Sequence, residues 1–169
     1  GKWGFVNSEG EIVIEPQFSQ VMEFSEGMAA VFQNNKWGFI DASGEFVIEP
    51  QFDEQPDVFH EGVVKVAVKS YSIRGEIIRY GFADLNGKII LPPVYSDAGY
   101  FSVGLAPVRI DNKYGYIDKT GRFIIEEIFE HALSFSKNKA LVCIERKWGL
   151  IKHPLYDNSL NEHLEKQLK

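Results

Sequence analysis

The feature that most constrains this chain is a short motif that occurs five times along its 169 residues. Each copy begins with an aromatic residue followed by glycine: Trp3-Gly4, Trp37-Gly38, Tyr80-Gly81, Tyr114-Gly115 and Trp148-Gly149. Successive copies are 34, 43, 34 and 34 residues apart, so one interval carries nine additional residues. A fixed period of this size is typical of repeat proteins, in which a unit that cannot bury its apolar face alone stacks on its neighbours.

Each copy opens with a pattern that predicts two short strands and a tight turn. Residues 37–40 are aromatic or β-branched, as in a strand, and Gly38 leaves room for the close approach of another backbone or ring. Residues 41–44 predict a hairpin turn, in which Asp41 accepts hydrogen bonds from turn amides and the glycine takes a positive φ. The second strand follows directly. We expect it to end at the proline (Pro16, Pro50 or Pro93), and its nearly continuous apolar character predicts burial on both faces.

A third strand completes the predicted period. It begins at a Phe-Ser-Glu-Gly box at residues 24–27, and related boxes occur at 59–62, 101–104 and 135–138. The glycine of this box is expected at positive φ. The third strand leads into the next aromatic-glycine pair through sequences such as Asn34-Asn35, which suit a tight primed turn. Each period therefore predicts about three short antiparallel strands in a meander.

Together these motifs resemble the WG-repeat family, also called the KWG-repeat family, which is found mainly in bacteria. The resemblance rests on Lys-Trp-Gly-Phe at 36–39, Ile-Glu-Pro-Gln-Phe at 48–52 and Phe-Ser-Glu-Gly at 24–27, in fixed order, and it covers residues 1–151. It implies an all-β tandem array without catalytic activity that mediates interactions. Because the number of repeats varies in the family, we expect an open stacked array. A small β-propeller is the alternative.

The predicted organisation has two parts. Residues 1–152 form the repeat array, with four periods and the start of a fifth, and residues 153–169 form a C-terminal amphipathic helix. Ser159 and Glu162 provide a capping box for that helix. One face of the helix carries the leucines Leu160, Leu164 and Leu168. We expect the helix to cover the last edge of the array, and a linker or a dimer helix is the competing interpretation.

The long interval between the second and third copies predicts an extended hairpin over residues 63–82, with its tip near 72–75. Insertions in repeat proteins become loops on one face, which is often the binding face. Tyr71, Arg74 and Arg79 are residue types that are common at binding hot spots, so they are the candidate binding residues. The competing interpretation is a surface insertion that is tolerated and has no role.

Charge and composition exclude some partners. The net charge is −6, and the scattered Lys and Arg residues form no basic stripe, which argues against nucleic acid. No apolar run has the length of a membrane span. The sequence does not decide whether the protein is located in the cytoplasm or in the cell envelope. The single Cys143 does not decide it, and a chain that starts with Gly1 is expected to lack its natural N-terminus.

No motif in the sequence predicts an enzyme, a cofactor or a metal site. The four histidines are scattered without zinc spacing, and neither a phosphate loop nor a nucleophile elbow is present. Cys143 lies in an apolar strand, where we expect a buried, unreactive thiol. At equivalent places in three copies stand Glu15, Glu49 and Glu126, which are either solvated edge charges or the lining of a cation or sugar groove.

The sequence thus predicts a non-enzymatic binding module, with another protein as the expected partner. The alternative is a module that binds glycans or the cell envelope. The tryptophans distinguish the two hypotheses. We expect Trp3, Trp37 and Trp148 in the core between repeats, whereas exposed indoles would favour the stacking of sugar rings.

Overall fold

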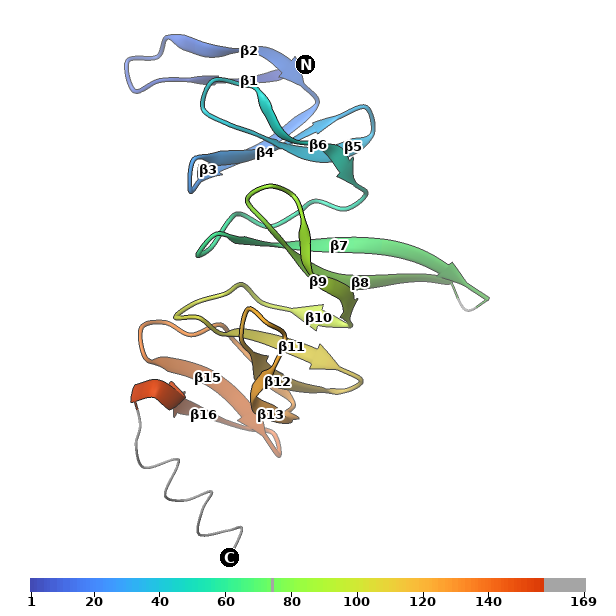
Figure 1. Cartoon of the computed structure of the whole chain (residues 1–169), viewed down its shortest axis with the longest axis vertical. Coiled ribbons are helices and arrows are strands. Elements are labelled where there is room, and N and C mark those ends of the chain that lie inside the picture. The colour runs from blue at the N-terminus through green and yellow to red at the C-terminus, as the bar shows by residue number, and fades with distance from the viewer. Residues whose placement is uncertain (74, 157–169) are drawn as a thin grey trace, which may run out of the picture. The chain divides into compact units, whose positions relative to one another are not determined.

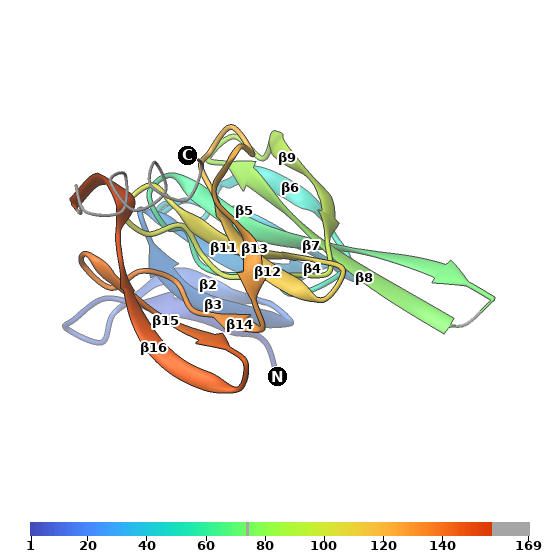
Figure 2. The same cartoon turned by 90° about the horizontal axis from the view of Figure 1, so that it is seen from below.

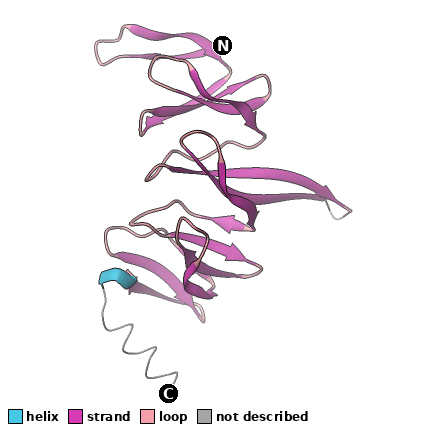
Figure 3. Ribbon diagram, viewed as in Figure 1, coloured by secondary structure: helices cyan, strands magenta, loops and turns pink. Residues whose placement is uncertain are grey.

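The structure is a computed structural model that describes residues 1–73 and 75–156. The described residues form strands β1 to β16 and a single turn of 3-10 helix, η1 (Pro154–Tyr156), without any α-helix (Figure 3). The chain divides into two compact units, Gly1–Ser96 and Asp97–Lys169. The predicted C-terminal helix falls mainly on residues 157–169, which lie outside the described residues.

The first unit contains three small antiparallel sheets (Figure 1). The first sheet pairs β1 (Trp3–Val6) with β2 (Ile12–Phe18). The second has the order β3 (Gln20–Ser25), β4 (Met28–Gln33), β5 (Lys36–Ile40) and β6 (Phe46–Phe52). The third consists of β7 (Val63–Ser72), β8 (Gly75–Asp84) and β9 (Ile89–Tyr95).

The second unit contains two sheets of the same kind. One has the order β10 (Asp97–Ala98), β11 (Ala106–Ile110), β12 (Lys113–Ile117) and β13 (Phe123–Phe129). The other consists of β14 (His131–Ala132), β15 (Lys139–Ile144) and β16 (Lys147–Lys152). The predicted all-β repeat fold is therefore confirmed. The described strands form open sheets and neither a closed barrel nor a propeller.

The sheets are out of phase with the sequence repeat. In the second sheet, β4 is the third strand of the period that starts at Trp3, whereas β5 and β6 belong to the period that starts at Trp37. A fourth strand, β3, adds to the predicted meander, because the connector after Phe18 pairs with β4. Each four-stranded sheet thus joins two successive periods through backbone hydrogen bonds, and neither period completes its sheet alone.

The glycine of the repeated pair lies opposite a bulge. Trp37 faces Phe52 and Phe39 faces Ile48, so Gly38 alone opposes the three residues 49–51. A Cβ atom on Gly38 would lie 2.5 Å from the carbonyl oxygen of Ile48 and 2.8 Å from the nitrogen of Pro50. The predicted close approach to this glycine is confirmed, and the approaching group is the backbone of the neighbouring strand. The same register shift occurs between β1 and β2, between β8 and β9, and between β12 and β13.

Two expectations about the second strand of each period are wrong. Strand β6 does not end at Pro50 but continues to Phe52, and β2 and β9 likewise pass Pro16 and Pro93. A proline within a bulge is tolerated because no ladder hydrogen bond requires its missing N–H. The strand is also not buried on both faces, since Ile48 is 2% exposed and Val47 is 42% exposed. In the fourth copy Glu127 replaces the proline and the register shift persists, so the bulge does not depend on proline.

The predicted turns form as expected. Asp41 Oδ1 accepts hydrogen bonds from the backbone nitrogens of Ser43 (2.8 Å) and Glu45 (3.2 Å) and from Ser43 Oγ (2.6 Å). The hydrogen bond from the Ser43 hydroxyl and those from the turn amides lower the pKa of Asp41 below its ordinary value of 3.8. Gly44 closes the turn at a φ of 89°. In the primed turn between β4 and β5, Asn34 and Asn35 have φ values of 53° and 63°.

The Phe-Ser-Glu-Gly box links neighbouring repeats in addition to forming a turn. The carboxylate of Glu26 accepts hydrogen bonds from the backbone nitrogens of Glu61 (2.7 Å) and Gly62 (2.7 Å), which belong to the next box. Ser25 Oγ donates to the carbonyl oxygen of Phe59 at 2.8 Å. The ring of Phe59 is 1% exposed and packs edge-on against Phe39, with ring centroids 5.0 Å apart. Polar and apolar contacts therefore hold these two repeats together.

Candidate binding surfaces

The longest hairpin of the first unit is formed by β7 and β8. The two strands pair over their whole length, from Val63 opposite Asp84 to Ser72 opposite Gly75. Burial ends halfway along. Val66 is 1% exposed, whereas Tyr71 is 79% exposed and Ile73 is fully exposed. Figures 1 and 2 both show this half of the hairpin extending beyond β9, its neighbour in the sheet. The distal half therefore adds little to the core and presents its side chains to solvent.

Ion pairs connect the hairpin with the segment that precedes it and with its own second strand. Lys69 Nζ lies 2.5 Å from Glu54 Oε1 and 3.6 Å from Glu76 Oε1. The hydrogen bond to Glu54 raises the pKa of Lys69 above its ordinary value of 10.5. Closer to the sheet, Lys65 Nζ lies 3.3 Å from Asp57 Oδ2. These contacts link the hairpin to the connector formed by residues 53–62.

The sequence-predicted binding residues do not form a single cluster. Tyr71 lies opposite Glu76, and Arg79 lies opposite Val68. Because side chains alternate between the faces of a strand, Tyr71 and Arg79 point to opposite faces of the hairpin. Arg79 is exposed, and its Nη1 donates to the carbonyl oxygen of Ile78 at 3.2 Å. Arg74 lies outside the described residues.

The face of the hairpin that carries Tyr71 combines aromatic, aliphatic and charged side chains. Directly opposite cross-strand pairs share a face, so Tyr71 and Glu76 lie beside Lys69 and Ile78. Ile73 at the tip adds an exposed aliphatic side chain. Sequence analysis did not select Ile73, since an isoleucine near a turn resembles any apolar strand residue until its exposure is known. This group of five residues is called the hairpin face below.

The tryptophans occupy two kinds of environment. Trp37 is 4% exposed in a core cluster that includes Phe39, Phe52 and Phe59. Trp3 and Trp148, by contrast, are 59% and 56% exposed. The expectation of a buried core position is therefore confirmed for Trp37 and wrong for Trp3 and Trp148. These two belong to β1 and β16, each of which has a single strand neighbour among the described residues, whereas β5 has two.

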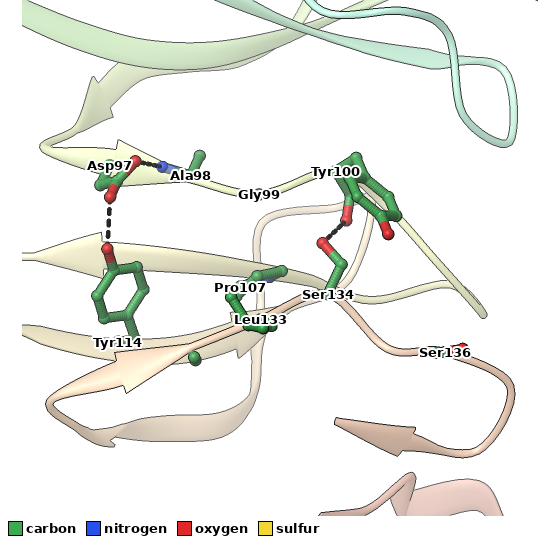
Figure 4. Close-up of a pocket in the computed structure, with 10 residues that line it drawn as sticks. Asp97, Ala98, Gly99, Tyr100, Pro107, Tyr114, Leu133, Ser134 and Ser136 are labelled. Atoms are coloured by element: carbon green, nitrogen blue, oxygen red, sulfur yellow. Dashed lines mark hydrogen bonds between the residues drawn. The ribbon is translucent and has the colours of Figure 1, made fainter. Parts of the chain in front are cut away.

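The second unit has an open groove of about 550 Å³ (Figure 4). Its lining comes from the connectors at 97–100 and 132–136 together with Pro107 and Tyr114. Tyr100 and Leu133 are 41% and 54% exposed and give the groove an aromatic and an aliphatic surface.

Three polar side chains of this groove, Asp97, Tyr114 and Ser134, form hydrogen bonds within the protein. The Tyr114 hydroxyl donates to Asp97 Oδ2, and Asp97 Oδ1 accepts from the nitrogen of Ala98 at 2.8 Å. Burial, with the Asp97 hydrogen bond, raises the pKa of Tyr114 to about 12. Ser134 Oγ donates to the carbonyl oxygen of Tyr100 at 2.7 Å. These hydrogen bonds connect the residues that line the groove, and Tyr100 and Leu133 are its exposed apolar side chains.

The residues that were considered for chemistry do not line the groove and are not part of the hairpin face. Glu15, Glu49 and Glu126 are exposed, as expected for solvated charges. Cys143 is 3% exposed, and burial raises the pKa of its thiol, which agrees with the predicted buried position. Within residues 1–73 and 75–156, no group of three His, Cys, Asp or Glu side chains could hold a metal ion. The same residues contain no helix that is long and apolar enough to span a bilayer.

The comparisons with known proteins address the family and not the ligand. No curated protein matches the chain. Among solved structures, it is similar to a plant lectin with two metal binding sites from Cicer arietinum, at 14% identity and a TM-score of 0.32, over 78% of this chain and 84% of that chain. The model of the WG containing repeat matches residues 3–37, 37–69, 80–114 and 114–148, which leaves the distal hairpin outside the repeats. The chain belongs to the WG containing repeat family.

Proposed function

We propose that this chain is a non-catalytic module that binds another protein through the hairpin face. The observation that carries the proposal is the exposure of Tyr71 (79%) and Ile73 (fully exposed) on a paired, anchored hairpin. Aromatic anchors on a preordered element bind at a low cost in conformational entropy, because few side-chain rotations are lost. The Lys69 and Glu76 charges beside Tyr71 supply a polar rim.

The position of the hairpin relative to the repeat supports the same function. Residues 70–79 lie between two matches to the repeat model, so the fold of the repeats does not require them. A long exposed hairpin with large apolar side chains exposes a protein to aggregation. Contact with a partner that covers Tyr71 and Ile73 would explain these exposed side chains, whereas the stability of the fold does not require them.

The test compares the intact chain with a short-hairpin variant in which residues 69–78 are replaced by Asn-Asn, the turn found at Asn34-Asn35. Both proteins are used as baits in a lysate of the source cells, and retained proteins are quantified by mass spectrometry. A candidate partner is then purified and titrated against the intact chain and Tyr71→Ala. We expect the affinity to fall at least about tenfold with Tyr71→Ala.

A matched control is Val94→Ala, which removes an exposed apolar side chain of β9 in the same unit. We expect it to bind like the intact chain. A partner that binds Tyr71→Ala and the short-hairpin variant with unchanged affinity would contradict the proposal.

Glycan binding is the second candidate, and the exposure of Trp3 and Trp148 favours it. An indole face that is open to solvent can stack on a sugar ring. The test is co-sedimentation of the intact chain with insoluble wall glycan. Saturable retention that is lost in the double variant Trp3→Ala Trp148→Ala, and kept in the short-hairpin variant, would place glycan binding ahead of protein binding.

A further inference from the structure

Strand β16 repeats the first strand of the motif, yet its outer edge carries no strand among the described residues. It contains Trp148-Gly149-Leu150-Ile151 and pairs with β15 alone. In Figure 2 it lies at the outer edge of the β14–β15–β16 sheet. After Lys152 the chain turns into η1 instead of a hairpin, and the nitrogen of His153 donates to the carbonyl oxygen of Asn138 at 2.8 Å.

The other four copies show what binds along this edge. In each copy, an antiparallel strand places an aromatic residue opposite the motif aromatic and an aliphatic residue opposite the side chain two positions later. The aromatic pairs are Trp3–Phe18, Trp37–Phe52, Tyr80–Tyr95 and Tyr114–Phe129. The pairs two positions later are Phe5–Ile14, Phe39–Ile48, Phe82–Leu91 and Tyr116–Ile125. The chain thus contains four examples of one mode of strand recognition.

Exposure in β16 marks the place where such a strand would lie. Leu150 occupies the position of Phe39 and is 66% exposed, whereas Phe39 is 1% exposed beneath β6. A Cβ on Gly149 would meet nothing within 4 Å, whereas a Cβ on Gly38 would collide with the carbonyl oxygen of Ile48. The space that a neighbouring backbone fills at Gly38 is therefore open at Gly149. The ring of His131 stacks on Trp148, with centroids 5.7 Å apart and planes 16° apart, and holds the indole in place.

Charges at the end of the strand add to this recognition. Lys36, just before Trp37, forms an ion pair with Asp53, just after Phe52. In the fourth copy, Lys113 Nζ lies 3.8 Å from Glu130 Oε1, in the corresponding positions. Lys147 stands at the same place before Trp148 and is exposed. A strand that binds β16 would therefore gain from an acidic residue that directly follows its aromatic residue.

We propose that the outer edge of β16 binds an extended segment of another protein as an added antiparallel strand. The segment carries an aliphatic residue, an aromatic residue four positions later and an acidic residue directly after it, as in Ile48, Phe52 and Asp53. Main-chain hydrogen bonds provide the affinity, and contacts with Leu150 and Trp148 select the sequence. This surface is separate from the hairpin face, so it does not depend on the function proposed above.

The experiment uses a fluorescent peptide with the sequence of residues 46–53, titrated into the intact chain and followed by anisotropy. We expect saturable binding. The same peptide with Ile48→Ser and Phe52→Ser is expected to bind at least tenfold more weakly. Gly149→Ala in the protein tests the geometry, because its added methyl group meets no atom of the free chain and would collide with an added strand. We expect Gly149→Ala to weaken binding at least tenfold without lowering the thermal midpoint.

Leu155→Ser in η1 is the matched control, since Leu155 is 82% exposed and lies off the edge. It is expected to bind the peptide like the intact chain. Absence of binding at the solubility limit of the peptide, or equal binding by Gly149→Ala, would overturn the proposal. Binding that appears only after residues 157–169 are removed would also overturn it. So would self-association of the chain that the peptide displaces. Glycan binding that Trp148→Ala abolishes and Gly149→Ala preserves would overturn it as well.

Discussion

At the scale of single residues, the repeated pair needs a glycine because the neighbouring strand leaves no room for a Cβ atom, and not because of the backbone angles of the glycine. Gly38 is not among the residues with positive φ, so alanine could adopt its conformation. The obstacle is the bulged strand, whose Ile48 oxygen would lie 2.5 Å from the new Cβ. Replacing the glycine therefore forces β5 and β6 apart where their pairing is closest.

We predict that Gly38→Ala lowers the free energy of unfolding by about 2–3 kcal/mol, the cost of an overpacked site that cannot relax without moving backbone. Gly149→Ala at the equivalent position should change it by less than about 1 kcal/mol, and in the stabilising direction, because alanine restricts the unfolded chain. Urea titration of both variants measures the two values. Equal destabilisation of the two variants would contradict the assignment of the cost to the bulge.

Glu26 is a residue whose side-chain hydrogen bonds reach the next repeat. Its two carboxylate oxygens accept one hydrogen bond each from Glu61 N and Gly62 N. Glu26→Gln keeps one acceptor and turns an amide N–H towards a backbone donor, so we predict a loss of about 1 kcal/mol in the free energy of unfolding. Glu9→Gln is the control, because the Glu9 side chain is exposed in a turn. An unchanged urea midpoint for Glu26→Gln would show that water replaces the link.

At the scale of elements, sequence analysis predicted the strands and turns better than it predicted how the strands pair. Residues 37–40 and 41–44 became a strand and a turn, because the aromatic-glycine pattern and the turn aspartate act locally. The bulge could not be predicted, since it appears only when the register of β5 against β6 is known. The split of Tyr71 and Arg79 between two faces has the same origin, because it depends on the cross-strand register of β7 and β8.

The distal hairpin is an element that should serve binding and not stability. We predict that replacing residues 69–78 by Asn-Asn changes the free energy of unfolding by less than about 1 kcal/mol, because the loop shortens and few buried contacts are lost. Far-UV circular dichroism and urea titration check the fold. A loss of several kcal/mol would show that the pairing of Lys69 with Glu54 and Glu76 matters for the first unit, and the single variant Lys69→Gln would then reproduce part of that loss.

At the scale of the whole molecule, the environment of a residue depends on which copy of the motif contains it. The same tryptophan position is buried at Trp37 and exposed at Trp3 and Trp148, although the local sequences are nearly identical. Sequence analysis treats the copies as equivalent and therefore predicted one environment for all three. The difference comes from the number of strands that flank each copy among the described residues, which is a property of the assembled sheets.

Two of the repeated turns are expected to make the stability of the molecule sensitive to acid. The hydroxyls of Ser43 and Thr120 and the turn amides lower the pKa values of Asp41 and Asp118 below the ordinary 3.8. At pH values between the lowered folded pKa and the ordinary 3.8, such a carboxyl group binds fewer protons in the folded state than in the unfolded state. Its stabilising contribution is complete above pH 3.8 and is lost as the pH falls through the folded pKa.

We predict that the double variant Asp41→Asn Asp118→Asn loses less stability than the intact chain as the pH falls below 3.8 and through the folded pKa values of these carboxyl groups. Asparagine can replace aspartate in these turns, since Asn7 Oδ1 accepts hydrogen bonds from Glu9 N (3.0 Å) and Glu11 N (2.9 Å) in the first copy. Urea midpoints at several pH values measure the difference, and Glu9→Gln is again the control. Some acid sensitivity should remain, because the hydrogen bond from Arg146 N lowers the pKa of Glu130. An identical decline in the double variant and the intact chain would show that the turn aspartates do not determine the acid response, and Glu130→Gln would be the next variant to measure.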